Sequence, residues 1–465
     1  MLKPITGTWF EFHHHNLPEG KYWNHSCRMF TEAQWETKIE EMASIGMKYV
    51  VLMASAMVYP DSCEAYFETD IYPMAKMSAA DPMEAMFRAA DRHGMKIFVG
   101  AGFYGFWQDT LRNMTDPEVT RRAFRAMEQL YARYGGHPSF YGWYLPDELG
   151  ICPYYPDDFI RYTNLYTGYG KSFDPSLQVL IAPYGTNMLK ADDRFVCQLE
   201  KLDCDIIAYQ DEVGCVRERF PLPRLRENWK RLAEIHSSLP IEMWANCENF
   251  TWERGTNDRT SALIPAAPER FMAQLEAASE AGVKRIVSFM MCGIFEPKQS
   301  RYSLGQPDLS ARAGEEYMRW MESGRPALRE RECAEGVITH CSETRLVDGV
   351  VGDENTANPA WVVLPKGEHE ISFSLTEGSK DATFSLGTLN YSPEGVRPPS
   401  RVALYGSEDG QTYELLEVVQ PYVWPNDRHD AWVQTIRFSH NNDSFKYFRL
   451  VLTCPSKCYM DEIQN

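Results

Sequence analysis

An alternation that repeats through the first two-thirds of the 465-residue chain constrains the fold most. A short apolar run ends in polar or small residues, an amphipathic helical stretch follows, and another short apolar run comes next. This alternation is typical of strand–helix units that build a parallel sheet. About eight apolar runs fit the pattern: 5–13, 48–57, 96–104, 140–148, 178–184, 205–211, 241–248 and 285–291.

The stretches between these runs carry helix start and stop signals. Thr31 with Gln34 is typical of a capping box, and Asp81 followed by Pro82 opens another helix, which Gly94 ends. Helices are also expected after Asp116-Pro117, after Pro268 and over 314–322. Eight such units in about 325 residues predict an α/β fold, the (β/α)8 TIM barrel. A doubly wound sheet is the alternative, but no GxGxxG or GxxxxGK[ST] follows the first run.

The pattern changes near residues 323–326. From about residue 337 onward no helix is expected, and turn signals separate short alternating segments. Seven segments fit strands: 361–364, 370–375, 382–386, 401–405, 412–419, 432–438 and 447–452. They predict an all-β sandwich. We therefore expect two domains, a barrel at 1–330 and a sandwich at 335–465.

Composition excludes several classes of function. With 47 Lys and Arg against 65 Asp and Glu, the net charge is −18, which repels nucleic acid. No run approaches the roughly 18 apolar residues of a membrane helix, so no membrane partner is expected. The 12 cysteines show no CxxC pair, so zinc-ligand spacing is absent and a reducing compartment is favoured. No signal peptide is recognised, which predicts a cytoplasmic protein unless a signal was removed. The oligomeric state stays unknown.

Carboxylates and aromatic rings follow the apolar runs, where a barrel places its active site. Two carboxylates on facing strand ends suit glycoside hydrolysis, because one protonates the leaving oxygen and the other attacks the sugar carbon or activates water. Rings and polar groups nearby can hold a sugar, although each has a structural interpretation as well. The candidates for substrate binding are His13, Trp107, Asp147, Tyr209, Trp244, Asn246 and Trp252.

Glu148 and Glu248 end the fourth and seventh runs. This placement resembles the retaining glycosidases of the clan A barrel superfamily. Residues 5–10, with Trp35 and 45–47, also resemble an uncharacterised bacterial family of glycosidase-like barrels that often carry a C-terminal β-domain. The resemblance implies a carbohydrate substrate, no cofactor, Glu148 as acid/base and Glu248 as nucleophile. We expect partial burial and the charge of Glu248 to raise the pKa of Glu148.

The chain departs from the clan pattern at three strands. Asp147 precedes the acid/base where the clan has Asn, no Arg follows the second run, and residues 290–292 replace the usual Trp. If the strand count is shifted by one, Glu212 becomes a candidate catalytic residue. The alternative catalytic residues are therefore Asp211, Glu212 and Glu296, besides Asp147. An alternative function is a non-catalytic carbohydrate-binding protein on a degenerate barrel.

The run His13-His14-His15 allows a third interpretation, a metal-dependent hydrolase. Alternate residues on a strand point the same way, so His13 and His15 could share one ion. Hydrogen bonding of at least one His to substrate, and a structural or solvent-exposed role, are each favoured over metal binding, so we predict no metal there.

The C-terminal region resembles discoidin-type, galactose-binding-like sandwiches at 346–349, 402–410 and 448–452. This resemblance implies glycan binding, a structural calcium, or a brace for the barrel, and we favour the brace. Trp424 and Trp432 are the residues to check for a sugar site. The identity of the sugar, its anomeric configuration and exo or endo action stay open.

Overall fold

The structure is a computed structural model, and it divides the chain into two compact units. The first comprises Met1–Trp252, Asn257–Ala266 and Gln274–Gly324, and the second Glu253–Thr256, Ala267–Ala273 and Arg325–Asn465. The predicted boundary between residues 330 and 335 lies outside the described residues. Those are 2–216, 222–253, 259–266, 268–323, 338–348, 350, 352, 357–375, 383–389, 397–421, 433–439 and 444–464.

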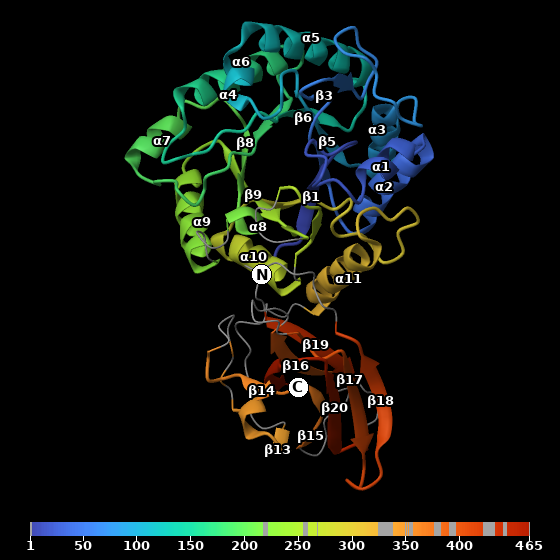
Figure 1. Ribbon diagram of the computed structural model, residues 1–465. Coiled ribbons are helices and arrows are strands. Elements are labelled where there is room, and N and C mark those ends of the chain that lie inside the picture. Colours follow the sequence, from blue (N-terminus) through green and yellow to red (C-terminus); the bar gives the residue numbers. More distant parts are fainter. Residues whose placement is uncertain are drawn as a thin grey trace. The chain divides into compact units, whose positions relative to one another are not determined.

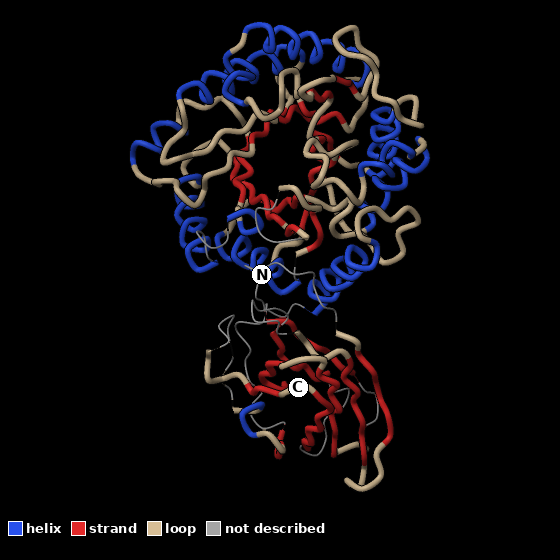
Figure 2. The backbone as a smooth tube through the Cα atoms, viewed as in Figure 1, coloured by secondary structure: helices blue, strands red, loops and turns tan. Residues whose placement is uncertain are grey.

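The first unit contains a closed barrel of eight parallel strands, which helices surround (Figure 1, Figure 2). The α/β barrel is therefore confirmed, and each predicted run contains one of its strands, in the predicted order. Strands such as β2, YVVL, are buried at every residue, as expected where a parallel sheet is covered on both faces. The strands are β1 (Ile5–Phe10), β2 (Tyr49–Leu52), β5 (Lys96–Gly100), β6 (Phe140–Leu145), β7 (Gln178–Ile181), β8 (Ile206–Gln210), β9 (Glu242–Glu248) and β12 (Arg285–Phe289).

The helices begin and end largely at the signals read from the sequence. Thr31 and Gln34 form the capping box of α2, and the Asp81 side chain accepts a hydrogen bond from the backbone N–H of Glu84 at 3.0 Å. Gly94 closes α3 in the left-handed conformation, at φ 60°. The helices are α1 (Asn24–Met29), α2 (Glu32–Ser44), α3 (Pro82–His93), α4 (Thr110–Thr115), α5 (Pro117–Tyr134), α6 (Asp157–Phe173), α7 (Asp193–Leu199), α8 (Val213–Val216), α9 (Leu222–His236), α10 (Pro268–Ala281) and α11 (Pro307–Ser323).

Helix α11 starts earlier than the expected 314–322. Gly314 suggests a helix start in the sequence, but it lies inside the helix. A Cβ atom there would stand 2.0 Å from the carbonyl oxygen of Glu296, so the close approach of the loop after β12 requires glycine. Pro307 is the true first residue, a position that proline favours.

Two short hairpins follow strands of the barrel. The pair β3 (Ala56–Val58) and β4 (Cys63–Ala65) follows β2, and the pair β10 (Phe250–Trp252) and β11 (Leu263–Pro265) follows β9. Trp252, which lies beyond the predicted run 241–248, is thus a strand residue and is buried.

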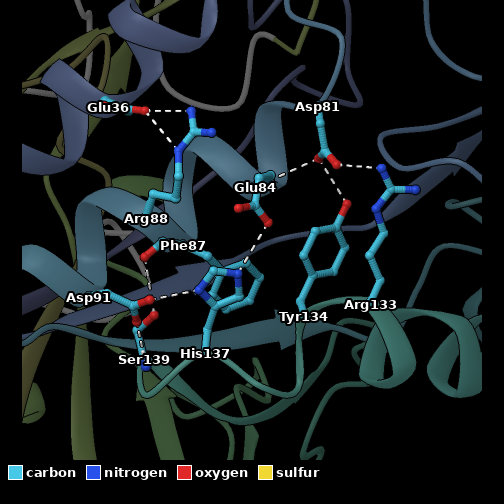
Figure 3. A network of polar contacts seen from close by, with 10 residues as sticks. All are labelled: Glu36, Asp81, Glu84, Phe87, Arg88, Asp91, Arg133, Tyr134, His137 and Ser139. Carbon is cyan, nitrogen blue, oxygen red and sulfur yellow. Dashed lines mark hydrogen bonds and ion pairs between the residues drawn. The ribbon is translucent and has the colours of Figure 1, made fainter.

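A polar network ties α3 to the end of α5 and the start of β6 (Figure 3). The ring of His137 contacts Asp91 through Nδ1 at 2.7 Å and Glu84 through Nε2 at 3.1 Å, and it stacks on Phe87. The carboxylate of Asp81, besides capping α3, accepts from Tyr134 at 2.9 Å. The network therefore links α3 to the segment that leads from α5 into β6.

The second unit contains two antiparallel sheets, ordered β13-β15-β20-β17-β18 and β14-β21-β16-β19. Buried residues of both sheets, such as Phe373, Leu450 and Met460, form one hydrophobic cluster. The strands are β13 (Ile338–Cys341), β14 (Val362–Leu364), β15 (Gly367–Leu375), β16 (Thr383–Leu389), β17 (Arg401–Ser407), β18 (Glu414–Val419), β19 (Val433–Ser439), β20 (Tyr447–Cys454) and β21 (Cys458–Gln464), and a 3-10 turn spans Thr344–Leu346.

The sequence missed β13 and β21. Strand β21 carries Asp461 and Glu462, which hide its strand character although both are buried. Asp461 accepts a hydrogen bond from the N–H of Gly352 at 2.6 Å, and Glu462 accepts one from that of Asp348 at 3.1 Å. Because these two acidic residues are buried and paired with backbone N–H groups, β21 lacks the alternation of apolar and polar residues by which a strand is recognised. Within the described ranges, no helix combines the length and apolar character that crossing a membrane requires.

Candidate active site

A cavity of about 680 Å³ lies among the segments that follow the barrel strands. Its volume is in the usual range of small-molecule sites. Its polar wall includes Glu148, Gln210, Glu212 and Glu248. Rings of His15, Phe103, Trp107 and Tyr184 form another part of its lining, together with Arg259. The structure thus brings the two predicted catalytic carboxylates to one cavity.

Glu148 follows β6 and is half-buried at the cavity wall. Its Oε1 accepts a hydrogen bond from the Tyr144 hydroxyl at 2.7 Å, and its Oε2 accepts one from Nε2 of Gln210, also at 2.7 Å. The same amide of Gln210 donates to the carbonyl oxygen of Ala182 at 2.9 Å, which fixes its orientation. Glu148 is therefore held by side chains from β6 and β8, the strands on either side of β7 in the barrel.

Burial raises the pKa of Glu148 to about 7, and the charge of Asp147 adds to the rise. The hydrogen bonds from Tyr144 and Gln210 favour the charged carboxylate and oppose it. The sequence predicts a rise caused by partial burial and by the charge of Glu248, and the burial part is confirmed. In the structure, the neighbouring charge that raises the pKa of Glu148 is that of Asp147, the adjacent buried acid.

Glu248 is the last residue of β9 and is buried. Its Oε2 accepts a hydrogen bond from the backbone N–H of Cys215, at 2.9 Å, which favours the charged form. Burial raises its pKa, and the carboxylates of Asp211 and Glu212 raise it further. Three acids at the ends of β8 and β9 therefore lie close enough together to affect the ionisation of Glu248.

Asp211 and Glu212 hold loops with their carboxylates. Asp211 accepts from the N–H groups of Val213 (3.2 Å) and Glu248 (3.1 Å), and from Nε2 of Gln274 at 2.6 Å. Glu212 lies on the cavity wall in the left-handed region, at φ 56°. Its two oxygens accept from the backbone N–H groups of Gly185 and Asn187, each at 2.9 Å.

The other two candidate acids are also engaged. Glu296 forms an ion pair with Lys38 at 2.9 Å, and both side chains are fully buried. Asp147 accepts from the Asn113 amide at 2.7 Å, and burial raises its pKa to about 7. Neither Glu296 nor Asp147 is among the residues that line the cavity.

The predicted substrate-binding aromatics divide into two groups. Trp107 lines the cavity and contacts the ring of His15, with centroids 4.3 Å apart. The indole N–H groups of Trp244 and Trp252 donate to Glu242 and Glu19, each at 3.0 Å. These last two rings are thus buried within the scaffold.

Two further predicted contacts lie on strands β8 and β9. The hydroxyl of Tyr209 contacts Nε2 of His236 on α9 at 2.9 Å, so it faces the helix layer. Asn246 is buried opposite Gln210, and its amide oxygen has no hydrogen-bond partner in the described part of the chain. These placements leave Trp107 as the predicted aromatic residue that reaches the cavity.

The three consecutive histidines have three different environments. Nδ1 of His13 contacts the Tyr59 hydroxyl at 2.8 Å, and burial lowers the pKa of His13 to about 4. His14 lies between Glu11 and Glu19; burial opposes its charge, but the two carboxylates raise its pKa to about 9. Burial lowers the pKa of His15 to about 3, so this cavity-lining ring is neutral.

Sequence reasoning missed Gln210, Tyr144, Tyr184 and Arg259. Gln210 is the last residue of β8, so its place at a strand end was the available signal. Arg259 lies beyond β10, and nothing in the pattern indicates that it returns to the cavity. In the second unit, Trp424 and Trp432 lie outside the described residues.

Comparison with solved structures finds proteins that are similar to this chain. A Bacteroides thetaiotaomicron VPI-5482 protein assigned as an alpha-L-fucosidase is 19% identical, covers 69% of this chain and 95% of its own, and has a TM-score of 0.52. An endo-1,4-beta-mannanase from Rhizomucor miehei is 10% identical, with coverages of 69% and 95% and a TM-score of 0.43. GH5_18 from Streptomyces cattleya, in complex with GlcNAc, is 15% identical, with coverages of 71% and 83% and a TM-score of 0.44.

The first likeness shows that the two chains share a fold. A search among curated proteins finds no match. Residues 5–301, more than half of the chain, match the family described as Domain of unknown function (DUF4434). The chain therefore belongs to the DUF4434 family.

Proposed function

We propose that the protein is a retaining glycoside hydrolase that acts on a carbohydrate through Glu148 and Glu248. One observation carries the proposal: these carboxylates, from the ends of the fourth and seventh barrel strands, line one cavity together with aromatic rings. Barrels of this kind place their chemistry at that end of the strands. Aromatic faces such as Trp107 suit the apolar face of a sugar ring.

Glu148 is the proposed acid/base. A general acid must carry its proton near neutral pH, and a pKa of about 7 satisfies this requirement. Glu148 gives its proton to the glycosidic oxygen as the bond from that oxygen to the anomeric carbon breaks. An oxygen of Glu248 attacks the same carbon and forms an ester. Glu148 then takes a proton from water, whose oxygen displaces Glu248 from the sugar.

Glu248 must be ionised to act as the nucleophile. Burial and the charges of Asp211 and Glu212 raise its pKa, whereas the backbone N–H of Cys215 lowers it. We therefore expect the rate to rise with pH as Glu248 loses its proton and to fall as Glu148 loses its own. The two-carboxylate reaction needs no cofactor. Retention corresponds to carboxyl groups about 5–5.5 Å apart, and inversion to about 6.5–9.5 Å.

The first test is hydrolysis of a panel of aryl glycosides by the wild type, Glu148→Gln and Glu248→Gln. Glu242→Gln is the matched control, because Glu242 stands at the opposite end of the strand that carries Glu248. We expect both site variants to lose at least a hundredfold in kcat and the control to retain activity. Activity that survives both changes would overturn the proposed pair.

A second test assigns the roles. Azide can replace the missing carboxylate in Glu148→Ala or Glu248→Ala. Rescue of the nucleophile variant yields a glycosyl azide of inverted configuration, and rescue of the acid/base variant yields the retained one. The reverse pattern would exchange the roles. A wild type that binds sugars in a calorimeter but hydrolyses none would support the carbohydrate-binding alternative.

A further inference from the structure

Three potential metal ligands meet just beyond the end of β1. Glu11, His14 and His15 each offer one ligand atom, and these atoms lie within 4.8 Å of one another. We call them the His14 cluster. His13, the neighbour in sequence, contacts Tyr59 and does not belong to it. Two imidazoles and one carboxylate are a donor set that zinc and related divalent transition metals accept.

A second observation points to a ligand at this cluster. Nδ1 of His15 is buried and has no hydrogen-bond partner among the residues that the structure describes. A buried polar nitrogen without a partner costs free energy, whereas a bound cation would satisfy it. The His15 ring contacts those of His14 and Trp107, at centroid distances of 4.4 and 4.3 Å, so its orientation is set by packing.

The surroundings of the cluster match those of a histidine metal site. A metal-bound His commonly donates its other ring N–H to a carboxylate, which sets its orientation. Nε2 of His14 stands 3.0 Å from Oε2 of Glu19, leaving Nδ1 toward the cluster. The other oxygen of Glu19 accepts from Trp252 at 3.0 Å.

The carboxylate ligand is oriented as well. Oε1 of Glu11 accepts a hydrogen bond from Nε1 of Trp23 at 3.0 Å. Nδ1 of His14 lies 2.9 and 3.0 Å from the two oxygens of Glu11. This contact, between two of the three prospective ligands, is the one that an ion would replace.

We propose that the His14 cluster binds one divalent transition-metal ion of the zinc class, through Glu11, His14 and His15. The carboxylates of Glu11 and Glu19 offset the charge of the ion. Because His15 lines the cavity, the ion fixes part of the cavity wall and leaves the chemistry to the carboxylates that line the same cavity. The inference does not depend on the proposed hydrolase activity.

The experiment is a calorimetric titration of the full chain with ZnCl2, after treatment with a chelator and its removal. We expect one ion per chain, with binding weakened at least tenfold in His15→Ala and in Glu11→Gln. Glu19→Gln, which changes the carboxylate beside Nε2 of His14 but removes none of the three ligands, should weaken binding by about 10–100-fold. His13→Gln is the matched control, since it removes an adjacent imidazole outside the cluster, and it should bind as the wild type does.

A second readout reports on the ligands directly. Co²⁺ added in place of zinc should give visible absorption bands that change in His15→Ala but not in His13→Gln. Because His15 is only partly buried, His15→Ala keeps the test valid if Glu11→Gln fails to fold. Absence of binding by the wild type would overturn the proposal. Equal weakening by His13→Gln and His15→Ala would also overturn it, since that result indicates adventitious binding to the histidine run.

Discussion

Replacing Glu148 by Gln should stabilise the protein at neutral and higher pH. Burial and Asp147 raise the pKa of Glu148 from its ordinary 4.5 to about 7 in the folded chain. The folded state therefore holds this proton more tightly than the unfolded state does. Stability contributed by this group is lost as pH rises from the unfolded to the folded pKa. Gln carries no ionisable proton, so the free energy of unfolding of the variant does not fall over this pH range for this reason.

The size of the effect follows from the shift. One pKa unit corresponds to about 1.4 kcal/mol, so a rise from 4.5 to about 7 gives an upper limit of about 3 kcal/mol above pH 7. Glu148 is half-buried and faces the cavity, so solvent screening reduces this figure to about 2 kcal/mol. For a unit of this size, about 2 °C per kcal/mol predicts a rise in Tm of about 4 °C.

The assay is calorimetric unfolding of wild type and Glu148→Gln at pH 5 and pH 8. The rise in Tm should be present at pH 8 and mostly absent at pH 5. Glu212→Gln is the matched control on the same cavity wall. Both oxygens of Glu212 accept backbone N–H groups, so an amide there loses one acceptor and should destabilise at both pH values. A Glu148→Gln variant with the same Tm difference at both pH values would refute the reasoning.

Two further changes test the scaffold. The carboxylates of Glu84 and Asp91 hold the pKa of His137 above its usual value, against the effect of burial. The stability that the charged His137 contributes to the folded state is therefore full below about pH 6.5. It is lost as pH rises through the pKa of His137 in the folded state. His137→Gln should therefore lower Tm more at pH 6 than at pH 9. Lys38→Met leaves Glu296 buried without its cation, and urea unfolding should show a loss of about 3–5 kcal/mol.

The strands of the barrel were predictable because each is a short apolar run closed by polar residues. Right-handed crossovers through helices then leave few ways to order parallel strands, and a closed barrel is one of them. The ends of strands were less predictable. The first predicted run spans 5–13, but β1 ends at Phe10, and the residues beyond it form the loop that carries the histidines.

The orientation of side chains at the strand ends is what the sequence could not supply. Neighbouring residues point to opposite faces of a strand. Tyr209 was expected at the substrate, yet it faces His236 on α9, and the adjacent Gln210 reaches Glu148 in the cavity. Which of two adjacent residues faces the cavity depends on the register in which the strand pairs with its neighbour. The pattern of apolar and polar residues does not define that register to within one residue.

The kind of hydrogen-bond donor beside an acid indicates its role. It distinguishes a carboxylate that can transfer a proton from one that only holds a loop in place. A backbone N–H can only donate, so it favours the ionised acid and opposes protonation. Glu212 accepts from two backbone N–H groups, and protonating it would forfeit one of them. At Glu148, one donor is the hydroxyl of Tyr144, which can reverse and accept when the carboxyl is protonated. Of the two acids, Glu148 can therefore gain and lose a proton without breaking the contacts that hold it.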